Sequence, residues 1–243
     1  MSAGGGALSG QVAIVTGAGR GIGHAIAMAL AREEAAVVLA ARTRQELAAA
    51  AATVRESGGT ALAIPTDVTQ DGVVEAMVEQ AVAELGRVDI LVTAAGAASF
   101  GPVVGTKPTD WDAILAVNLR AVLVCCRAVL PVMIRQRRGT IINIASVAAQ
   151  RPIPGAAVYT ATKAGVVGFS RVLAEELRGD GVRVGVLVPG AVDTPLWDSI
   201  ANSPDRSRML RPEDVARAAV LMASLPPGAS LEELTLLPSG GIL

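Results

Sequence analysis

Short runs of apolar, β-branched residues alternate along this chain with longer segments of helical periodicity. Strands are predicted at Val12–Thr16, Ala36–Ala41, Ala61–Ile64, Asp89–Thr93, Thr140–Ala145, Val182–Val188 and Glu233–Leu237. Helices are predicted near residues 22–33, 44–57, 70–85, 109–136, 157–179 and 212–224. Strands without polar alternation are typical of a sheet that is covered on both faces. The pattern therefore predicts an α/β fold, a doubly wound, Rossmann-like parallel sheet of about seven strands with helices on both faces.

Nothing in the sequence divides the chain into parts. No linker, repeat or low-complexity segment interrupts residues 1–243, and this length fits one large α/β domain. Thr109 and Asp110 follow Pro108 and predict an N-cap for the long helix. Residues 194–211 mix Pro, Asn, Ser and Arg with Leu and Trp197, and this composition predicts a mobile flap with one short helix.

Charge and hydropathy exclude several classes of partner. The 21 basic and 22 acidic residues leave a net charge of −1, so no global field favours nucleic acid or an anionic membrane. No uninterrupted apolar run reaches the roughly 18–20 residues of a membrane span. Residues 1–10 lack the basic and apolar regions of a signal peptide. We therefore expect a soluble, cytoplasmic protein with no nucleic-acid or membrane partner.

The residues that most often bind metals are scarce. Cys125 and Cys126 are adjacent within an apolar helical pattern, which indicates buried thiols in a reducing compartment. His24 is the single histidine, and its position on the first predicted helix suggests packing or a solvent-facing side chain. Without a cluster of ligands, no metal site is expected.

A glycine-rich turn follows the first predicted strand and opens the first predicted helix. It comprises Gly17, Ala18, Gly19, Arg20, Gly21, Ile22 and Gly23. Gly17, Gly21 and Gly23 form a G-x-x-x-G-x-G spacing, which lets the backbone turn sharply and approach a pyrophosphate at a helix N-terminus. Alone, such a turn could be a tight strand–helix connection. At the first strand of a parallel α/β chain, it predicts a dinucleotide site.

The end of the second strand indicates which dinucleotide binds. An acidic residue there would bind the ribose hydroxyls of NAD and repel a 2′-phosphate, but this chain has Ala41. Arg42 follows, Arg20 lies in the glycine turn, and two guanidinium groups can pair with a phosphate. Either arginine could instead point to solvent. The combination predicts NADP(H) in preference to NAD(H).

Two further turns at strand ends are candidates for cofactor contacts. Asp67 and Val68 follow the third strand and are placed to meet the adenine, although Asp67 could instead cap the next helix. Ala94, Ala95 and Gly96 follow the fourth strand and supply the small side chains that a close backbone approach needs.

A phenol and an ammonium group occupy one face of a predicted helix, at Tyr159 and Lys163. Tyr159 is the only tyrosine, and Ser146, after the fifth strand, could hydrogen-bond the same substrate oxygen. A free phenol has a pKa near 10, so a neighbouring ammonium and an oxidised nicotinamide are expected to lower the pKa of Tyr159.

Together these motifs resemble the short-chain dehydrogenase/reductase family, in its single-domain branch, over nearly the whole chain. The resemblance implies that Tyr159 is the general acid/base, that Ser146 orients the substrate oxygen and that Lys163 binds the nicotinamide ribose. It implies that Asn118 completes a water-linked proton relay. The stretch expected to hold the nicotinamide carboxamide comprises Pro189, Gly190, Val192 and Thr194. One departure is the pair Thr93-Ala94, where the family usually has two asparagines.

The resemblance implies an NADP(H)-dependent enzyme that interconverts a ketone or aldehyde and an alcohol by hydride transfer, with a small-molecule substrate. It also implies a homo-oligomer, either a dimer or a homotetramer, built on the helices at 109–136 and 157–179. One alternative is a 3-oxoacyl-[acyl-carrier-protein] reductase, for which Arg135, Arg137, Arg138 and Arg171 are candidate docking residues. An alternative of another class is a catalytically silent NADP-binding sensor.

Overall fold

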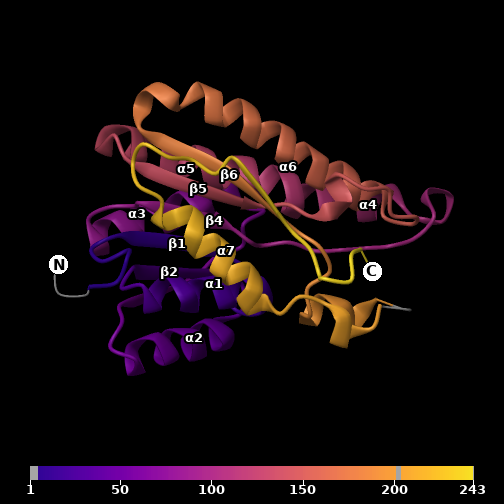
Figure 1. Cartoon of the computed structure of the whole chain (residues 1–243), viewed down its shortest axis with the longest axis horizontal. Helices are drawn as coiled ribbons and strands as arrows, with labels where there is room; N and C mark the ends of the chain where they lie inside the picture. Colours follow the sequence, from indigo (N-terminus) through magenta and orange to yellow (C-terminus); the bar gives the residue numbers. More distant parts are fainter. Residues whose placement is uncertain (1–4, 201–203, 243) are drawn as a thin grey trace.

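A parallel sheet of seven strands, in the order β3-β2-β1-β4-β5-β6-β7, lies at the centre of the computed structural model (Figure 1), which describes residues 5–200 and 204–242. The strands are β1 (Val12–Thr16), β2 (Ala36–Ala41), β3 (Ala61–Pro65), β4 (Ile90–Thr93), β5 (Gly139–Ile144), β6 (Val182–Pro189) and β7 (Glu233–Leu236). Every pairing between neighbouring strands is parallel. The predicted fold class is confirmed, and each predicted strand boundary lies within one residue of the observed one.

Helices cover both faces of this sheet. They are α1 (Gly21–Arg32), α2 (Arg44–Glu56), α3 (Asp71–Leu85), α4 (Pro108–Leu115), α5 (Ala121–Gln136), α6 (Ala157–Glu176) and α7 (Pro212–Ser224). Helices α1, α2 and α7 contribute to the apolar core on one face, and α3, α5 and α6 contribute to the core on the other. Along β1, Ala13 and Val15 point into the first core, whereas Val12 and Ile14 point into the second. This double burial explains why the strands are continuously apolar.

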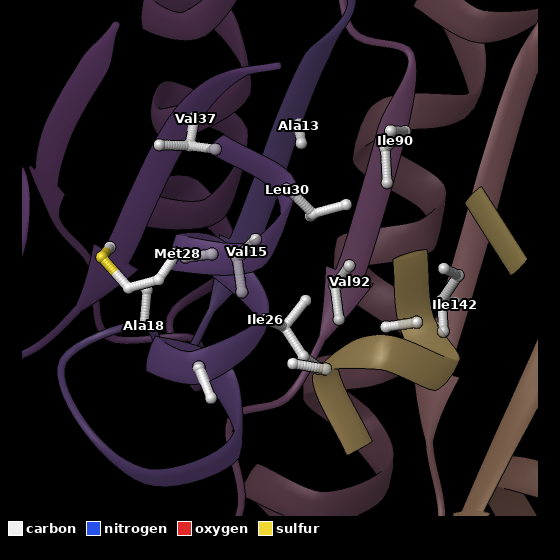
Figure 2. Packing of buried hydrophobic residues seen from close by; sticks show 14 of the residues in the cluster. Ala13, Val15, Ala18, Ile26, Met28, Leu30, Val37, Ile90, Val92 and Ile142 are labelled. Atoms are coloured by element: carbon white, nitrogen blue, oxygen red, sulfur yellow. The ribbon is translucent and has the colours of Figure 1, made fainter. Parts of the chain in front are cut away.

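The first core is built from aliphatic side chains of modest size. Figure 2 shows Ile26 and Leu30 of α1 lying against the sheet residues Val15, Ile90 and Val92. Burying one such side chain contributes about 1.5–3 kcal/mol. Alanines with short side chains line the buried faces of α1 and α7, so the two helices pack closely against each other and the sheet.

The predicted long helix is continuous from Pro108 to Gln136 but contains an irregular turn. Residues Ala116–Arg120 form a π-helical turn between α4 and α5. The predicted N-cap is wrong, because Pro108 is already inside the helix and the capping position is Lys107, which makes no side-chain cap. Proline tolerates this first position, where its missing N–H would have no helical partner.

By length and composition alone, this 29-residue helix could cross a membrane, with a mean hydropathy of 2.0 in its most apolar window. The helix is nevertheless not an uninterrupted apolar run, because Arg120 and Arg127 lie within it, so the prediction made from the sequence stands. Many of its apolar residues belong to the protein core, since 44% of that window is buried inside the protein. Cys125, Cys126 and Met133 lie on the buried side, against the sheet.

The predicted flap contains two short 3₁₀ helices, Pro195–Ser199 and Arg206–Arg208, where one was expected. Residues 201–203 of the flap lie outside the described residues. The Arg206 guanidinium links the two described parts, because it donates to Asp193 at 2.5 Å and to Asp198 at 2.7 Å.

The strand order creates a switch point between β1 and β4. From β1 the chain proceeds to β2 on one side, whereas β4 lies on the other side and leads to β5. In open α/β sheets, ligands bind beyond the carboxyl ends of the strands at such a point. The glycine turn after β1 and the turn after β4 both lie there.

Candidate functional site

The glycine turn joins β1 to α1 and requires glycine at several positions. Gly17 has a φ of +69°, and a Cβ atom there would approach the backbone nitrogen of Ala95 to 2.8 Å. Gly21 has a φ of +60°, and a Cβ atom at Gly23 would collide with the carbonyl oxygen of Gly17. The turn therefore packs directly against the turn after β4, with no side chains between them.

The N-terminus of α1 is open to a ligand. Arg20 occupies the capping position with an extended backbone and makes no side-chain cap, and no acidic residue lies in the first turn. Its first N–H groups, beginning at Gly21 and Ile22, have no partner within the helix, which is the usual arrangement for binding a phosphate.

Thr16 takes over the support of the turn after β4, where the family pattern has asparagines. Its hydroxyl accepts hydrogen bonds from the backbone nitrogens of Ala94 at 3.1 Å and Ala95 at 3.3 Å. Thr93, the neighbour of Thr16 on β4, instead contacts β5, where its hydroxyl donates to Asn143 Oδ1 at 2.7 Å. The missing asparagine contacts are thus replaced, and Gly96 follows with its backbone exposed.

Asn143 is the centre of a buried polar network that the sequence did not reveal. Its Nδ2 atom donates to Ser170 Oγ at 2.9 Å, and Ser170 donates in turn to the carbonyl of Val166 at 2.7 Å. Asn143 and Ser170 are both at most 1% exposed. The network joins β4 and β5 to α6, the helix that carries Tyr159 and Lys163.

The adenosine end of the site combines positive charge with one acidic group. Arg20 and Arg42 are exposed, and Ala41 at the end of β2 leaves space beside Gly19. The carboxylate of Glu46, from the first turn of α2, lies there as well, because a Cβ atom at Gly19 would be 2.5 Å from its Oε2. Only the tertiary structure shows this carboxylate next to the glycine turn, since Glu46 is 27 residues away in the sequence.

Asp67 and Val68 lie after β3 in different surroundings. Asp67 accepts hydrogen bonds from the backbone nitrogen of Thr69 at 3.0 Å and from its hydroxyl at 2.7 Å, and these bonds lower the pKa of the carboxyl. Helix α3 begins with Gln70 as its capping residue, so Asp67 is not its N-cap. Val68 is buried in the core beside α3.

The stretch after β6 is held by the neighbouring strand and by the flap. The backbone nitrogen of Gly190, next to Pro189, donates to the carbonyl of Leu236 at 2.8 Å, and Val192 pairs with Leu210 in an isolated parallel bridge. Thr194 is buried and lies against Gly21, where an added Cβ atom would be 3.4 Å from its methyl group. The segment predicted to bind the pyrophosphate and the segment predicted to hold the nicotinamide carboxamide thus meet.

The candidate catalytic side chains converge on the carboxyl ends of β4 and β5. Lys163 and Tyr159 lie one turn apart on α6, with the ammonium nitrogen 5.8 Å from the centre of the phenol ring. Lys163 is 6% exposed and donates to the carbonyl of Ile144 at 2.9 Å. Ser146 follows β5, and its hydroxyl oxygen accepts from the backbone nitrogen of Ala148 at 3.2 Å, which leaves its proton free to donate.

Asn118 lies in the π-helical turn and is completely buried. Its Oδ1 accepts from the backbone nitrogen of Ala97 and its Nδ2 donates to the carbonyl of the same residue, both at 2.8 Å. Asn118 and Lys163 both lie close to Gly96. A Cβ atom added to this glycine would be 3.3 Å from Asn118 Oδ1 and 3.9 Å from Lys163 Nζ. Such irregular turns are frequent at functional sites.

Burial determines the proton affinities of this site. Burial raises the pKa of Tyr159 above its usual value, and hydrogen bonding to the Ser146 hydroxyl acts in the opposite direction. Burial lowers the pKa of Lys163 to about 8. In the protein chain by itself desolvation of the phenol is the larger effect, and the lowering expected from the ammonium together with an oxidised nicotinamide stays a prediction.

Within residues 5–200 and 204–242, no three His, Cys, Asp or Glu side chains are close enough together to hold a metal ion. Both cysteines are buried free thiols, as predicted, and burial raises the pKa of Cys125 to about 12. His24 is partly buried on α1, and its Nδ1 atom is enclosed without a hydrogen-bond partner among the described residues.

A doubly wound parallel sheet, with a glycine turn at its switch point and a serine, tyrosine and lysine at its carboxyl edge, defines a Rossmann-like oxidoreductase. The comparisons with known proteins agree. The model of the short chain dehydrogenase family matches residues 11–205. A 3-oxoacyl-[acyl-carrier-protein] reductase from Synechocystis sp. is 37% identical to this chain over 98% of both sequences. The chain belongs to the short-chain dehydrogenase/reductase family.

Two solved structures resemble the chain over almost its whole length. A metagenomic short-chain oxidoreductase in complex with NADP has a TM-score of 0.85 and 39% identity, covering 96% of this chain and 99% of that one. An alcohol dehydrogenase from the archaeon Thermococcus sibiricus, complexed with 5-hydroxy-NADP, has a TM-score of 0.87 and 32% identity, covering 94% and 97%.

Proposed function

We propose that this oxidoreductase uses NADP(H) to interconvert a ketone or aldehyde and an alcohol, with Tyr159 as the general acid/base. The observation that carries the proposal is the convergence of Ser146, Tyr159 and Lys163 beside the glycine turn. These three side chains come from two different segments, and all of them lie at the carboxyl edge of the sheet, where the family binds its ligands.

The residues present fit a dinucleotide. The uncapped N-terminus of α1 offers N–H groups to the pyrophosphate, and the absence of side chains at Gly17 and Gly23 leaves the backbone accessible. Lys163 would bind the nicotinamide ribose, and the stretch from Pro189 to Thr194 would hold the carboxamide. When bound, the nicotinamide supplies the hydride or accepts it.

The side chains of the chain itself move the proton. In the direction of reduction, Tyr159 donates its phenol proton to the substrate oxygen while Ser146 donates a hydrogen bond to the same atom. Lys163 and Asn118 then return a proton to Tyr159 through water. The raised pKa of Tyr159 suits this direction, because it keeps the phenol protonated until the oxygen acquires negative charge.

Two arginines support NADP(H) in preference to NAD(H). Arg20 and Arg42 are exposed at the adenosine end, where Ala41 replaces the acidic residue expected of an NAD enzyme. The two similar structures carry NADP and 5-hydroxy-NADP. Glu46 weighs against a 2′-phosphate, because its carboxylate lies beside Gly19 and like charges repel.

The test is the oxidation of NADPH and NADH, measured side by side by absorbance with a panel of ketones, aldehydes, quinones and 3-oxoacyl thioesters. Turnover with NADPH well above that with NADH supports the whole proposal. Turnover with NADH alone would contradict the assignment of the cofactor, and binding without turnover across the panel would contradict the proposed reaction.

A second candidate is the reduction of a 3-oxoacyl group on an acyl-carrier protein, since the Synechocystis relative carries that name. This reaction needs a basic surface near the site to dock the acidic carrier. Arg171 is engaged with Glu233 at 2.8 Å, and Arg137 donates to the carbonyl of Gly179 at 3.0 Å, so both are already partnered. Retention of this protein on an immobilised carrier protein would support the second candidate.

We also propose that the chain forms a homodimer or homotetramer through α5 and α6. Val172 on α6 is 59% exposed and Ile134 on α5 is 37% exposed, so a partner subunit could bury both side chains. Light scattering after size-exclusion chromatography would measure the mass directly, and a monomer at micromolar concentration would contradict this proposal.

A further inference from the structure

The aromatic residues of this chain are few and unevenly distributed. The sequence has one tyrosine, two tryptophans and two phenylalanines. Three of these five residues, Phe100, Tyr159 and Trp197, form one cluster at the proposed site. They come from the loop after β4, from α6 and from the flap, so only the tertiary structure brings them together.

The geometry of the cluster is that of interacting rings. Phe100 and Trp197 are stacked with an interplanar angle of 5° and ring centres 6.1 Å apart. Phe100 is tilted by 49° to Tyr159, with ring centres 5.9 Å apart. Aromatic pairs prefer separations of about 4.5–7 Å in such offset or tilted arrangements. Phe100 therefore connects the proton-donating phenol with the flap.

Both outer rings are anchored by the backbone around them. The indole nitrogen of Trp197 donates to the carbonyl of Val192 at 2.8 Å, so the ring is held at the start of the flap. On the other side, the backbone nitrogen of Gly101 donates to the carbonyl of Gly155 at 2.8 Å, which fixes the residue after Phe100. Phe100 and Trp197 nevertheless remain partly exposed, so part of each residue is accessible to a ligand.

The flap beside the cluster has a paired arginine, and the loop of Phe100 is uncharged. Arg206 is bound to Asp193 and Asp198 at the base of the flap. The loop from Ala97 to Phe100 contains no titratable residue. Phe100 is therefore flanked on its own loop by small, uncharged side chains.

We propose that this site selects carbonyl compounds that carry an aromatic ring, and that the ring packs against the Phe100–Trp197 pair while the carbonyl oxygen meets Tyr159 and Ser146. This inference rests on the proposed function and specifies its substrate class. One aromatic pair contributes about 0.5–1.5 kcal/mol beyond the area that it buries, which corresponds to a two- to thirteenfold preference for an aromatic over a saturated ring.

The test compares two ketones that differ only in the ring, phenylacetone and cyclohexylacetone. In both, a methylene group separates the ring from the carbonyl, so the ring does not change the intrinsic reactivity by conjugation. We expect the wild-type protein to reduce phenylacetone with a kcat/KM about two to thirteen times that for cyclohexylacetone. The ratio should fall towards one in Phe100→Leu and in Trp197→Leu.

Val104→Ala is the matched control, because Val104 lies on the same surface segment, is 97% exposed and touches neither ring pair. The ratio should be unchanged in this variant. An equal rate for both ketones in the wild-type protein would overturn the inference and leave the proposed function intact. A ratio that persists in both leucine variants would overturn it as well.

A binding measurement separates this inference from the proposed reaction. In a Trp111→Phe variant, Trp197 is the only tryptophan, so its fluorescence reports on the cluster alone. We expect phenylacetone to change this fluorescence in a saturable way and cyclohexylacetone to bind several-fold more weakly. If neither ketone is reduced, the proposed reaction fails for aromatic and alicyclic ketones. If phenylacetone also causes no saturable change in the Trp197 fluorescence, the aromatic site is refuted as well.

Discussion

The two ends of the candidate site are built in different ways. At the chemical end, Lys163 and Asn118 are buried, and each is held by hydrogen bonds to the backbone of the neighbouring sheet or turn. At the adenosine end, Arg20 and Arg42 are exposed, with no hydrogen bond or ion pair of their side chains among those found in the described residues. The comparison teaches that the side chains proposed for proton transfer are preorganised, whereas the proposed cofactor preference depends on side chains that a ligand must order.

This difference predicts that changes at the chemical end affect turnover and changes at the adenosine end affect cofactor affinity. Preorganised groups act mainly on the transition state, because their positions are set before the substrate binds. Exposed charged side chains act mainly through binding, and their contribution is reduced by solvent and salt.

The largest expected effect is that of Tyr159→Phe. Removal of the phenol hydroxyl should lower kcat about 10²- to 10⁴-fold, the usual contribution of a general acid. Binding of NADPH, measured by its fluorescence, should change little, because the ring and its contact with Phe100 remain. Retained turnover in a folded variant would refute the role of Tyr159.

A pH profile should show a second large effect at the same end. Lys163 is charged below its pKa of about 8 and neutral above it, so the return of a proton to Tyr159 is lost as the pH rises. With saturating NADPH, kcat/KM for ketone reduction should fall about tenfold per pH unit above that value. In Lys163→Arg the guanidinium stays charged, so this decline should disappear even if the rate is lower. The same decline in both proteins would assign it to another group.

At the adenosine end, Arg20→Ala and Arg42→Ala should each weaken NADPH binding about ten- to 150-fold, since a hydrogen bond to a charged group contributes about 1.5–3 kcal/mol. Binding of NADH, which lacks the 2′-phosphate, should be nearly unchanged. Arg44→Ala is the matched control, because Arg44 is a neighbouring exposed arginine on α2 with no proposed contact. Equal losses of affinity for NADPH and NADH would show that the two arginines do not bind the 2′-phosphate.

The smallest expected effect is that of Glu46→Gln. Removing this carboxylate should tighten NADPH binding by up to about fivefold, because a like-charge pair near 4 Å in water is worth about 1 kcal/mol. NADH binding should change less, and the effect should shrink at high salt. Weaker binding of both cofactors would instead show that Glu46 contacts the ribose.

The sequence was sufficient for the fold because its signals are local. Most strands are short, largely apolar runs bounded by polar or turn residues, and the central strands are buried on both faces by helices, so strand boundaries were predicted within one residue. The glycine turn was equally clear, since Gly17 and Gly23 must lack side chains where β1 meets α1. The spacing of Tyr159 and Lys163 follows from one helical turn.

Other features depend on contacts that no local pattern records. The π-helical turn that carries Asn118 interrupts a segment that reads as one regular helix. Thr16 replaces the asparagine contacts of the family from a different strand, and Glu46 reaches the glycine turn from the next helix. None of these partners is near in the sequence, so their meeting was not predictable from spacing.

By itself the sequence determined the layered α/β fold, the position of the dinucleotide turn and the residues that form the candidate catalytic set. The tertiary structure decided how these residues behave. Burial, which exists only in the folded chain, raises the pKa of Tyr159 and lowers that of Lys163, and folding gathers three of the five aromatic rings beside them. The physical reason is that hydrophobic patterning acts over a few residues, whereas desolvation and ring packing depend on every segment that closes around a site.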